Sequence, residues 1–187
     1  MMNVYETCPS FENEKYQIRL IQNEDAKSLL KVYSDVKAVP FFNSDNCNGD
    51  NFYYETYERM EQAVAFWVDA YKNGWFVRWT VVDKAAGEPV GTIEEFYREA
   101  DDYFTNCGLL RLDLRSDYEK SEEIENILSL IATPSFDMFG CDKVAVKAIS
   151  DDKERVKALQ NAGFVSTDEK LIGHDGTQYG EYFVLKK

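Results

Sequence analysis

Apolar and charged residues alternate from Leu110 to Arg115, and a different spacing begins a few positions later. Alternation with a period of two predicts a strand with one apolar and one polar face. From Glu122 onward, isoleucine and leucine recur at the i, i+3, i+4 and i+7 spacing, which places them on one face of a helix. Residues 109–131 therefore predict a strand, a short turn at residues 115–117 and a helix.

The start of this helix is unusually acidic. Backbone N–H groups are unpaired at a helix N-terminus, and in many folds they bind phosphate groups there. In this sequence the first turn contains no glycine and four glutamates, at positions 119, 122, 123 and 125. Acidic residues in a first turn are also ordinary complements of the helix dipole, each worth about 0.3–1 kcal/mol. We favour this second interpretation over a special role for the carboxylates.

The same patterns predict the remaining elements. Residues before Tyr16 resemble a leader that is irregular or loosely packed, and Thr133-Pro134 should end or kink the central helix. Asp151 and Glu154 form a capping box for a helix that ends at Gly163. We expect strands at 16–21, 76–82, 90–97 and 143–149, a helix that begins at Ala26 and stops before Pro40, a second helix at 58–71, and a final hairpin that turns near His174.

A segment rich in turn-forming residues and aromatic residues runs from Phe41 to Tyr57. It predicts a long loop. Long loops in compact domains are often functional, and these aromatic side chains could line a substrate pocket. Alternatively, they fix the loop to the body of the domain, and we favour this simpler role.

Composition limits the classes of function. With 187 residues, of which 44% are hydrophobic, the chain can form one domain with a sizeable core, and we expect a leader at 1–15 and a single domain at 16–187. A formal net charge of -13 argues against binding to nucleic acid or to anionic membrane surfaces. The four cysteines are widely spaced and there is one histidine, so we expect no metal site and reduced thiols in the cytoplasm.

The order of these elements, together with several short motifs, resembles the GNAT superfamily of N-acetyltransferases. The motifs are Ile18-Arg-Leu20, Asp25-Ala26, Gly91-Thr-Ile93, Asp117-Tyr118 and Gly163-Phe164. Each is weak alone, but their order and spacing cover nearly the whole chain from Tyr16. The branch that acetylates ribosomal-protein alanine is the most similar. The resemblance implies an α/β (α+β) fold with a mixed, mostly antiparallel central sheet and helices on both faces.

The resemblance also implies acetyl transfer from acetyl-CoA to an amine. In the family the pantetheine arm pairs with the strand around Leu112 and Leu114, and the diphosphate binds the N–H groups of the following turn. The residues that this places at the cofactor are Leu112, Leu114, Arg115, Lys120, Ser121 and Arg155. We expect a small amine or peptide as acceptor, and a monomer or homodimer.

The sequence departs from the family's phosphate-binding motif. Glu119 stands at the usual Gln or Arg position, Glu122 at a glycine position and Leu159 at the position of a tyrosine that often acts as general acid. A carboxylate about 5 Å from a phosphate oxygen costs on the order of 3 kcal/mol at an effective dielectric of about 20. Lys120, Ser121 and Arg155 are the candidates to offset this cost.

For the chemistry itself, Glu94 is our first candidate for a base that activates the acceptor amine through water, and Tyr182 for the acid that protonates the leaving thiolate. A solvated strand carboxylate and a packed tyrosine are the alternatives. We expect His174 to be exposed and Cys107 to be a buried, unreactive thiol.

Two functions follow, and they belong to different classes. The first is an acyl-CoA-dependent N-acetyltransferase that acts on a small cationic amine or a peptide N-terminus, for which the acidic surface is suited. The second is a GNAT-fold pseudo-enzyme that has lost the cofactor and acts as a binding or regulatory module. Leu159 and the missing glycines of the phosphate-binding motif favour the second. We favour the first because active enzymes predominate within the fold.

Overall fold

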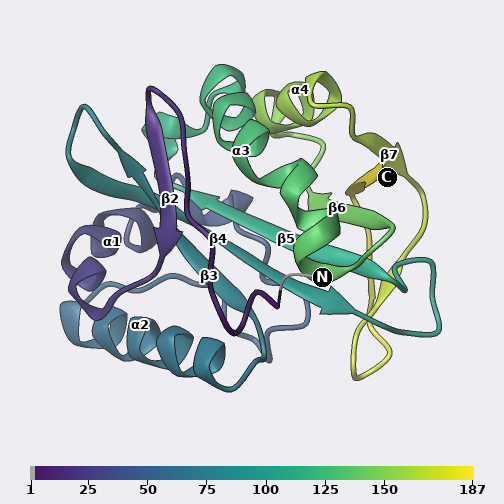
Figure 1. Cartoon of the computed structure of the whole chain (residues 1–187), viewed down its shortest axis with the longest axis horizontal. Coiled ribbons are helices and arrows are strands. Elements are labelled where there is room, and N and C mark those ends of the chain that lie inside the picture. The colour runs from purple at the N-terminus through teal and green to yellow at the C-terminus, as the bar shows by residue number, and fades with distance from the viewer. Residues whose placement is uncertain (1–2) are drawn as a thin grey trace.

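The computed structural model describes residues 3–187 as a central sheet with helices on both faces (Figure 1). The strand order in the main sheet is β1-β2-β3-β4-β5-β6-β10-β7, and β8 and β9 form a separate hairpin. The strands are β1 (Phe11–Glu12), β2 (Tyr16–Leu20), β3 (Val77–Asp83), β4 (Glu88–Arg98), β5 (Cys107–Leu114), β6 (Lys143–Lys147), β7 (Val165–Thr167), β8 (Leu171–Ile172), β9 (Gln178–Tyr179) and β10 (Tyr182–Lys186). The helices are α1 (Ala26–Tyr33), α2 (Tyr57–Lys72), α3 (Ser121–Phe139) and α4 (Lys153–Asn161).

Strands β5 and β6 form the one parallel pair in this sheet, and they separate toward their carboxyl ends. Their pairing runs only from Cys107 opposite Lys143 to Leu110 opposite Val146. On its other edge, β5 stays paired with β4 as far as Leu114. Backbone groups of residues 111–114 are therefore left without a strand partner on the β6 side. We call this part of β5 the splayed edge.

The alternation in β5 distributes its side chains over two covered faces. Leucines 110, 112 and 114 belong to the large core cluster that includes α3 and α4, as the period-two pattern predicts. Arg111 and Asp113 lie on the opposite face, where Tyr33 of α1 donates a hydrogen bond to Asp113. Figure 1 shows α1 and α2 on one side of the sheet and α3 and α4 on the other. The polar face of this strand is thus buried rather than solvated.

Residues 3–10 are irregular, as expected, but the segment 3–15 is not loosely packed; positions 1 and 2 of the expected leader lie outside the described residues. Val4 is buried in the main core, and β1 extends the sheet by pairing with β2. The Trp79 indole donates a hydrogen bond to the Pro9 carbonyl oxygen, and the Tyr71 hydroxyl donates one to the carbonyl oxygen of Val4. The segment has no strong periodicity because long-range side-chain contacts, rather than an amphipathic pattern, hold it in place.

Two expected helix boundaries are wrong: α3 does not end at Pro134, and Asp151 is not the N-cap of α4. Helix α3 continues through Pro134 to Phe139 and ends at Gly140, which has the left-handed conformation that glycine tolerates. The packed helix therefore accommodates the missing N–H of Pro134. The N-cap of α4 is Asp152, which accepts a hydrogen bond from the Arg155 amide, and not Asp151. No helix within residues 3–187 is long and apolar enough to cross a membrane.

Candidate functional site

A cavity of about 660 Å³ lies on the side of the sheet that carries α1 and α2. Its walls come from α2, the 41–57 loop, β4, β5 and the β8–β9 hairpin. Phe52 and Tyr54 of the loop line the cavity, and they also pack against the buried ring of Tyr33. These side chains therefore both line a cavity and fix the loop to the body of the domain. We call this space the acceptor cavity, after the amine acceptor that the family resemblance implies.

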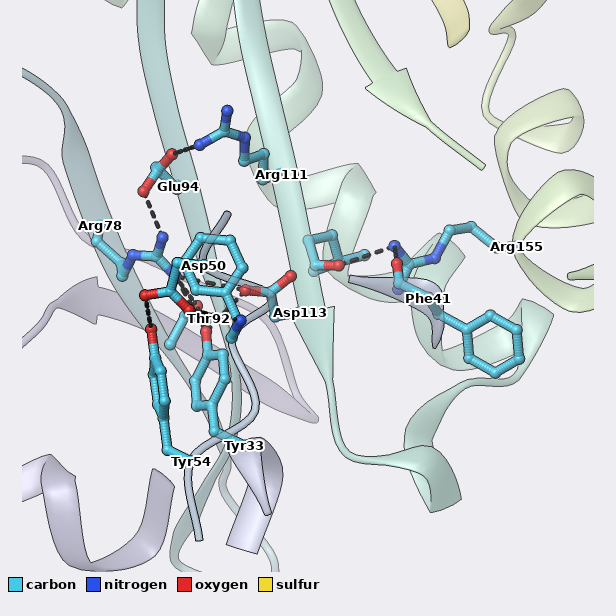
Figure 2. Close-up of polar contacts among 12 residues, drawn as sticks. Tyr33, Phe41, Asp50, Tyr54, Arg78, Thr92, Glu94, Arg111, Asp113 and Arg155 are labelled. Carbon is cyan, nitrogen blue, oxygen red and sulfur yellow. Dashed lines mark hydrogen bonds and ion pairs between the residues drawn. The ribbon is translucent and has the colours of Figure 1, made fainter. Parts of the chain in front are cut away.

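The wall of the acceptor cavity contains Glu94 between two arginines (Figure 2). Arg111 Nη1 donates a hydrogen bond to Glu94 Oε1 over 2.6 Å, and Arg78 Nη2 donates one to Oε2. Burial alone would raise the pKa of Glu94, but the two guanidinium groups outweigh it and lower the pKa below its ordinary value. Glu94 is consequently an ionised group whose two oxygens are both engaged.

Arg111 connects Glu94 to the other predicted catalytic residue, Tyr182. Its Nη2 donates to the Asp45 backbone carbonyl oxygen over 2.9 Å, and the Asp45 carboxylate accepts a hydrogen bond from the Tyr182 hydroxyl over 3.0 Å. Lys147 Nζ lies 2.7 Å from both carboxylate oxygens of Asp45. Burial and the nearby Asp45 raise the pKa of Tyr182. The hydroxyl therefore stays protonated at neutral pH.

A second part of this buried network lies on the α1 side (Figure 2). The Tyr33 hydroxyl is 2.8 Å from Asp113 Oδ2 and 2.7 Å from the Thr92 hydroxyl. Arg78 Nη1 is 3.0 Å from both the Tyr33 and the Thr92 hydroxyl oxygens. Burial raises the pKa of Asp113, although Arg78 opposes the shift. These contacts fix Arg78, and through it they fix Glu94.

The splayed edge of β5 is occupied by Arg155 from α4. Its Nη1 donates to the Leu112 carbonyl oxygen over 2.8 Å and to the Phe41 carbonyl oxygen over 3.1 Å; Figure 2 shows Arg155 and Phe41. Its Nε and Nη2 donate to the two carboxylate oxygens of Glu119, each over 2.7 Å. Arg155 and Glu119 are both buried. A buried, bidentate pair of this kind is strongly held, because removal of either partner leaves an uncompensated charge.

A carboxylate also caps the N-terminus of α3. Glu154 Oε2 accepts a hydrogen bond from the Ser121 backbone N–H over 2.7 Å. This N–H is one of the groups at which the family resemblance places the diphosphate. Nearby, burial raises the pKa of Asp152 to about 6. The N-terminus of α3 is therefore surrounded by acidic side chains, and the Ser121 N–H is already satisfied by one of them.

In this arrangement the predicted cofactor residues do not fit acetyl-CoA. The Leu112 carbonyl group, which the pantetheine arm would need, is bonded to Arg155, and the Ser121 N–H is bonded to Glu154. The Leu114 side chain lies in the core. Arg115 forms ion pairs with Glu88 and Asp117. Lys120, the N-cap of α3, is exposed.

Several residues of this region were not among the sequence-based candidates. Arg111 had been assigned only to a polar strand face, and Asp45 and Arg78 had been given no role. Their pairing with residues far away in sequence leaves no periodic signal. The one available signal was the presence of charged residues inside strands whose neighbours are apolar.

Metal and thiol chemistry have little support in residues 3–187. This part of the chain holds no group of three or more His, Cys, Asp or Glu side chains that could bind a metal ion. All four cysteines are free, and burial raises the pKa of the Cys107 thiol to about 12, so it is unreactive. His174 is exposed, as expected, and lies at the cavity wall.

Known structures resemble this fold over almost its whole length. A ribosomal-protein-S5-alanine acetyltransferase from Vibrio fischeri is 20% identical, with a TM-score of 0.67 and 96% of each chain covered. A GNAT-family acetyltransferase from Bacillus anthracis is 10% identical, with a TM-score of 0.70, 95% of this chain covered and 98% of that chain. RimL, a ribosomal L7/L12 alpha-N-protein acetyltransferase in complex with coenzyme A, is 9% identical, with a TM-score of 0.69, 95% of this chain covered and 98% of that chain.

At these identities the likeness establishes the fold, which is that of the GNAT acetyltransferases. The mixed, mostly antiparallel sheet with helices on both faces agrees with the architecture expected from the sequence. No family model matches the sequence, and no curated protein sequence matches it.

Proposed function

We propose that this protein, which has the GNAT fold, is an N-acetyltransferase that transfers an acyl group to the primary amine of a small molecule or a peptide N-terminus. The observation that carries the proposal is the acceptor cavity, in whose wall Arg111 links Glu94 to the Asp45–Tyr182 pair. A roomy cavity with a few convergent polar groups is the usual form of a small-molecule site. Structural neighbours that acetylate ribosomal proteins support the reaction class.

Within this proposal Glu94 holds Arg111 in place rather than accepting a proton. Its lowered pKa makes it a weak base, and both of its oxygens already accept hydrogen bonds from guanidinium groups. Tyr182 keeps its proton at neutral pH, but its raised pKa makes it a weak acid and its hydroxyl already donates to Asp45, so within this proposal it holds Asp45 in place rather than donating a proton. Acetyl-CoA is the donor that the fold implies, and no step is assigned to it because Arg155 and Glu154 hold the groups that it would need.

A non-catalytic binding module is the second candidate, and the Arg155 contacts favour it. For a cofactor to pair with β5, the Arg155 guanidinium has to leave the Leu112 carbonyl oxygen and its bidentate contact with Glu119. The acidic side chains beside the α3 N-terminus oppose a diphosphate further. A chain that does not bind acetyl-CoA would still have the acceptor cavity but could not transfer an acyl group.

Isothermal titration with acetyl-CoA and with free CoA separates the two candidates. Micromolar binding by the native chain, followed by acetylation in an amine screen, would support the acetyltransferase. A variant with Glu119→Arg and Glu122→Gly, whose fold circular dichroism verifies because Arg155 loses its partner, tests the splayed edge and the N-terminus of α3 directly. If the native chain shows no binding and this variant binds CoA, then the residues at positions 119 and 122 have removed the cofactor site from the native chain. If the native chain does not bind at millimolar cofactor, the acetyltransferase proposal fails, whatever the variant does.

A further inference from the structure

Exposed apolar side chains are concentrated at the acceptor cavity. Seven large hydrophobic residues are exposed in residues 3–187, and four of them line this one cavity. They are Phe66, Trp75, Tyr97 and Ile172, with 53%, 60%, 42% and 38% of their surfaces exposed, respectively. Exposed apolar groups that gather at a concave site, rather than scattering singly over the surface, mark a place where an apolar ligand binds.

The mouth of the cavity is largely aromatic. The ring of Phe66, on α2, lies 6.3 Å from the ring of Trp75 and 6.2 Å from that of Phe76, and all three line the cavity. Tyr97 of β4 and Ile172 of β8 contribute further apolar surface. Tilted rings at these separations are favourable aromatic contacts. They offer the same kind of contact to a ligand ring.

The carboxylates buried in the cavity wall, by contrast, already have cationic partners. Asp45 is paired with Lys147, and Glu94 with two arginines. Asp50 is paired with Arg59. The remaining acid of the wall, Glu99, is exposed at the surface. The cavity therefore offers a polyamine no buried, unpaired carboxylate, although the net charge of the whole chain is -13.

Among the described residues that line the cavity, one buried polar atom lacks a partner. Arg111 is nine-tenths buried, and its Nε atom has no hydrogen-bond partner among residues 3–187, whereas its two terminal nitrogens are engaged. A buried N–H without a partner destabilises the folded state. The atom is enclosed in the unliganded chain, so a ligand oxygen, from a carbonyl or a carboxylate group, would reach it after a small shift of the Arg111 side chain and would satisfy it.

We propose that the ligand of the acceptor cavity is an aromatic amino-acid unit, either free or as the first residue of a peptide. Its ring lies among Phe66, Trp75 and Tyr97, and its carbonyl or carboxylate oxygen accepts a hydrogen bond from Arg111 Nε. That this unit is the acceptor of an acyl group rests on the proposed function; its binding does not. Recognition is then by apolar contact and by a guanidinium donor, and not by attraction of a cation.

Ligand-observed NMR and titration of the native chain without any cofactor test this proposal. The probes are phenylalanine, the amide of a peptide that begins with phenylalanine, phenethylamine and spermidine. We expect the two phenylalanine probes to bind at least about fivefold more tightly than phenethylamine, which lacks the oxygen, and more tightly than spermidine. The affinities of phenylalanine and of the peptide amide, compared with each other, show whether the ligand is the free amino acid or a peptide.

Two exposed aromatic residues provide a matched pair of variants. Trp75→Ala should weaken phenylalanine binding by at least about tenfold, because it removes a ring from the mouth of the cavity. Tyr57→Ala removes an aromatic side chain that is 48% exposed and does not line the cavity, and it should leave binding unchanged. Because Trp75 is largely exposed, its loss should not unfold the chain, and circular dichroism verifies this.

Three results would overturn the inference: spermidine binding as tightly as phenylalanine, equal effects of the two variants, or no binding of either phenylalanine probe at millimolar concentration. None of them depends on CoA. Loss of aromatic binding would thus refute this inference alone, whereas failure of donor binding or of acetylation would refute the proposed function and leave the inference standing.

Discussion

Glu95 should make the stability of this protein depend on pH in an unusual direction. It lies on β4 beside Glu94 but points to the opposite face of the sheet, where it is fully buried against α3. The Ser135 hydroxyl lies 2.8 Å from Glu95 Oε2 and 2.8 Å from the Ile131 carbonyl oxygen. One hydroxyl can donate only one proton. A protonated Glu95 that donates to Ser135, while Ser135 donates to Ile131, satisfies both contacts.

Burial raises the pKa of Glu95 from its ordinary value of 4.5 to about 8, and the Ser135 hydroxyl opposes the shift only in part. Its Oε1 has no hydrogen-bond partner within the described chain. A carboxyl group whose pKa is higher in the folded state than in the unfolded state contributes its full stabilisation at pH values below the unfolded-state pKa. That stabilisation is lost as the pH rises through the folded value. Each pH unit between the two values is worth about 1.4 kcal/mol, or about 5 kcal/mol in all.

Glu95→Gln removes this ionisation and keeps the shape of the side chain. The free energy of unfolding of the variant, relative to the native chain, should rise by about 2.5 kcal/mol from about pH 5.5 to about pH 7.5. Urea denaturation of both proteins across this range measures the difference, and other titrating groups cancel in it. Glu169→Gln, at an exposed carboxylate, is the control and should show no such trend. A difference that stays constant within about 0.5 kcal/mol would refute the reasoning.

Three further substitutions test the buried contacts, each by chemical or thermal denaturation. Arg155→Met should destabilise the fold by about 3–5 kcal/mol, because Glu119 is left buried and unpaired. The double variant with Glu119→Leu should recover most of this loss. A cost below about 1 kcal/mol for Arg155→Met alone would contradict the expectation. Tyr182→Phe should cost about 1–3 kcal/mol, because Asp45 and Asn43 lose a partner in a buried site, and an unchanged urea midpoint would argue against it. Gly91→Ala should cost about 1–3 kcal/mol and lower Tm by several degrees, since a Cβ at this position would overlap the Asp113 backbone carbonyl oxygen; an unaltered Tm would mean that β4 and β5 can shift apart.

Much of the fold could be predicted because local periodicity carries it. The strand at Leu110 to Leu114 and the helix after it have the expected pattern, and α1 begins at Ala26 and stops before Pro40, as predicted. The loop between Phe41 and Tyr57 was likewise evident from its turn-forming residues. The packing of residues 3–15 could not be predicted because it depends on long-range contacts with α2 and β3.

The candidate site was predicted less well. Glu94 and Tyr182 do lie in one cavity wall, but the residue that joins them, Arg111, was not a candidate. Its role depends on the Asp45 backbone carbonyl, 66 positions earlier in the chain. No spacing rule reports such a contact.

The sequence by itself determined most of the strands and helices and that the region after β5 is acidic, because both are properties of neighbouring residues. Only the tertiary structure decided what the acids do. Glu119 lies 36 positions before Arg155, and the fold brings the two together at the carbonyl group of Leu112. Packing of α4 against the splayed edge buries this pair, and burial makes it a strong interaction instead of a solvated one. A chain of the same composition with a different fold could have left the splayed edge without a side-chain partner.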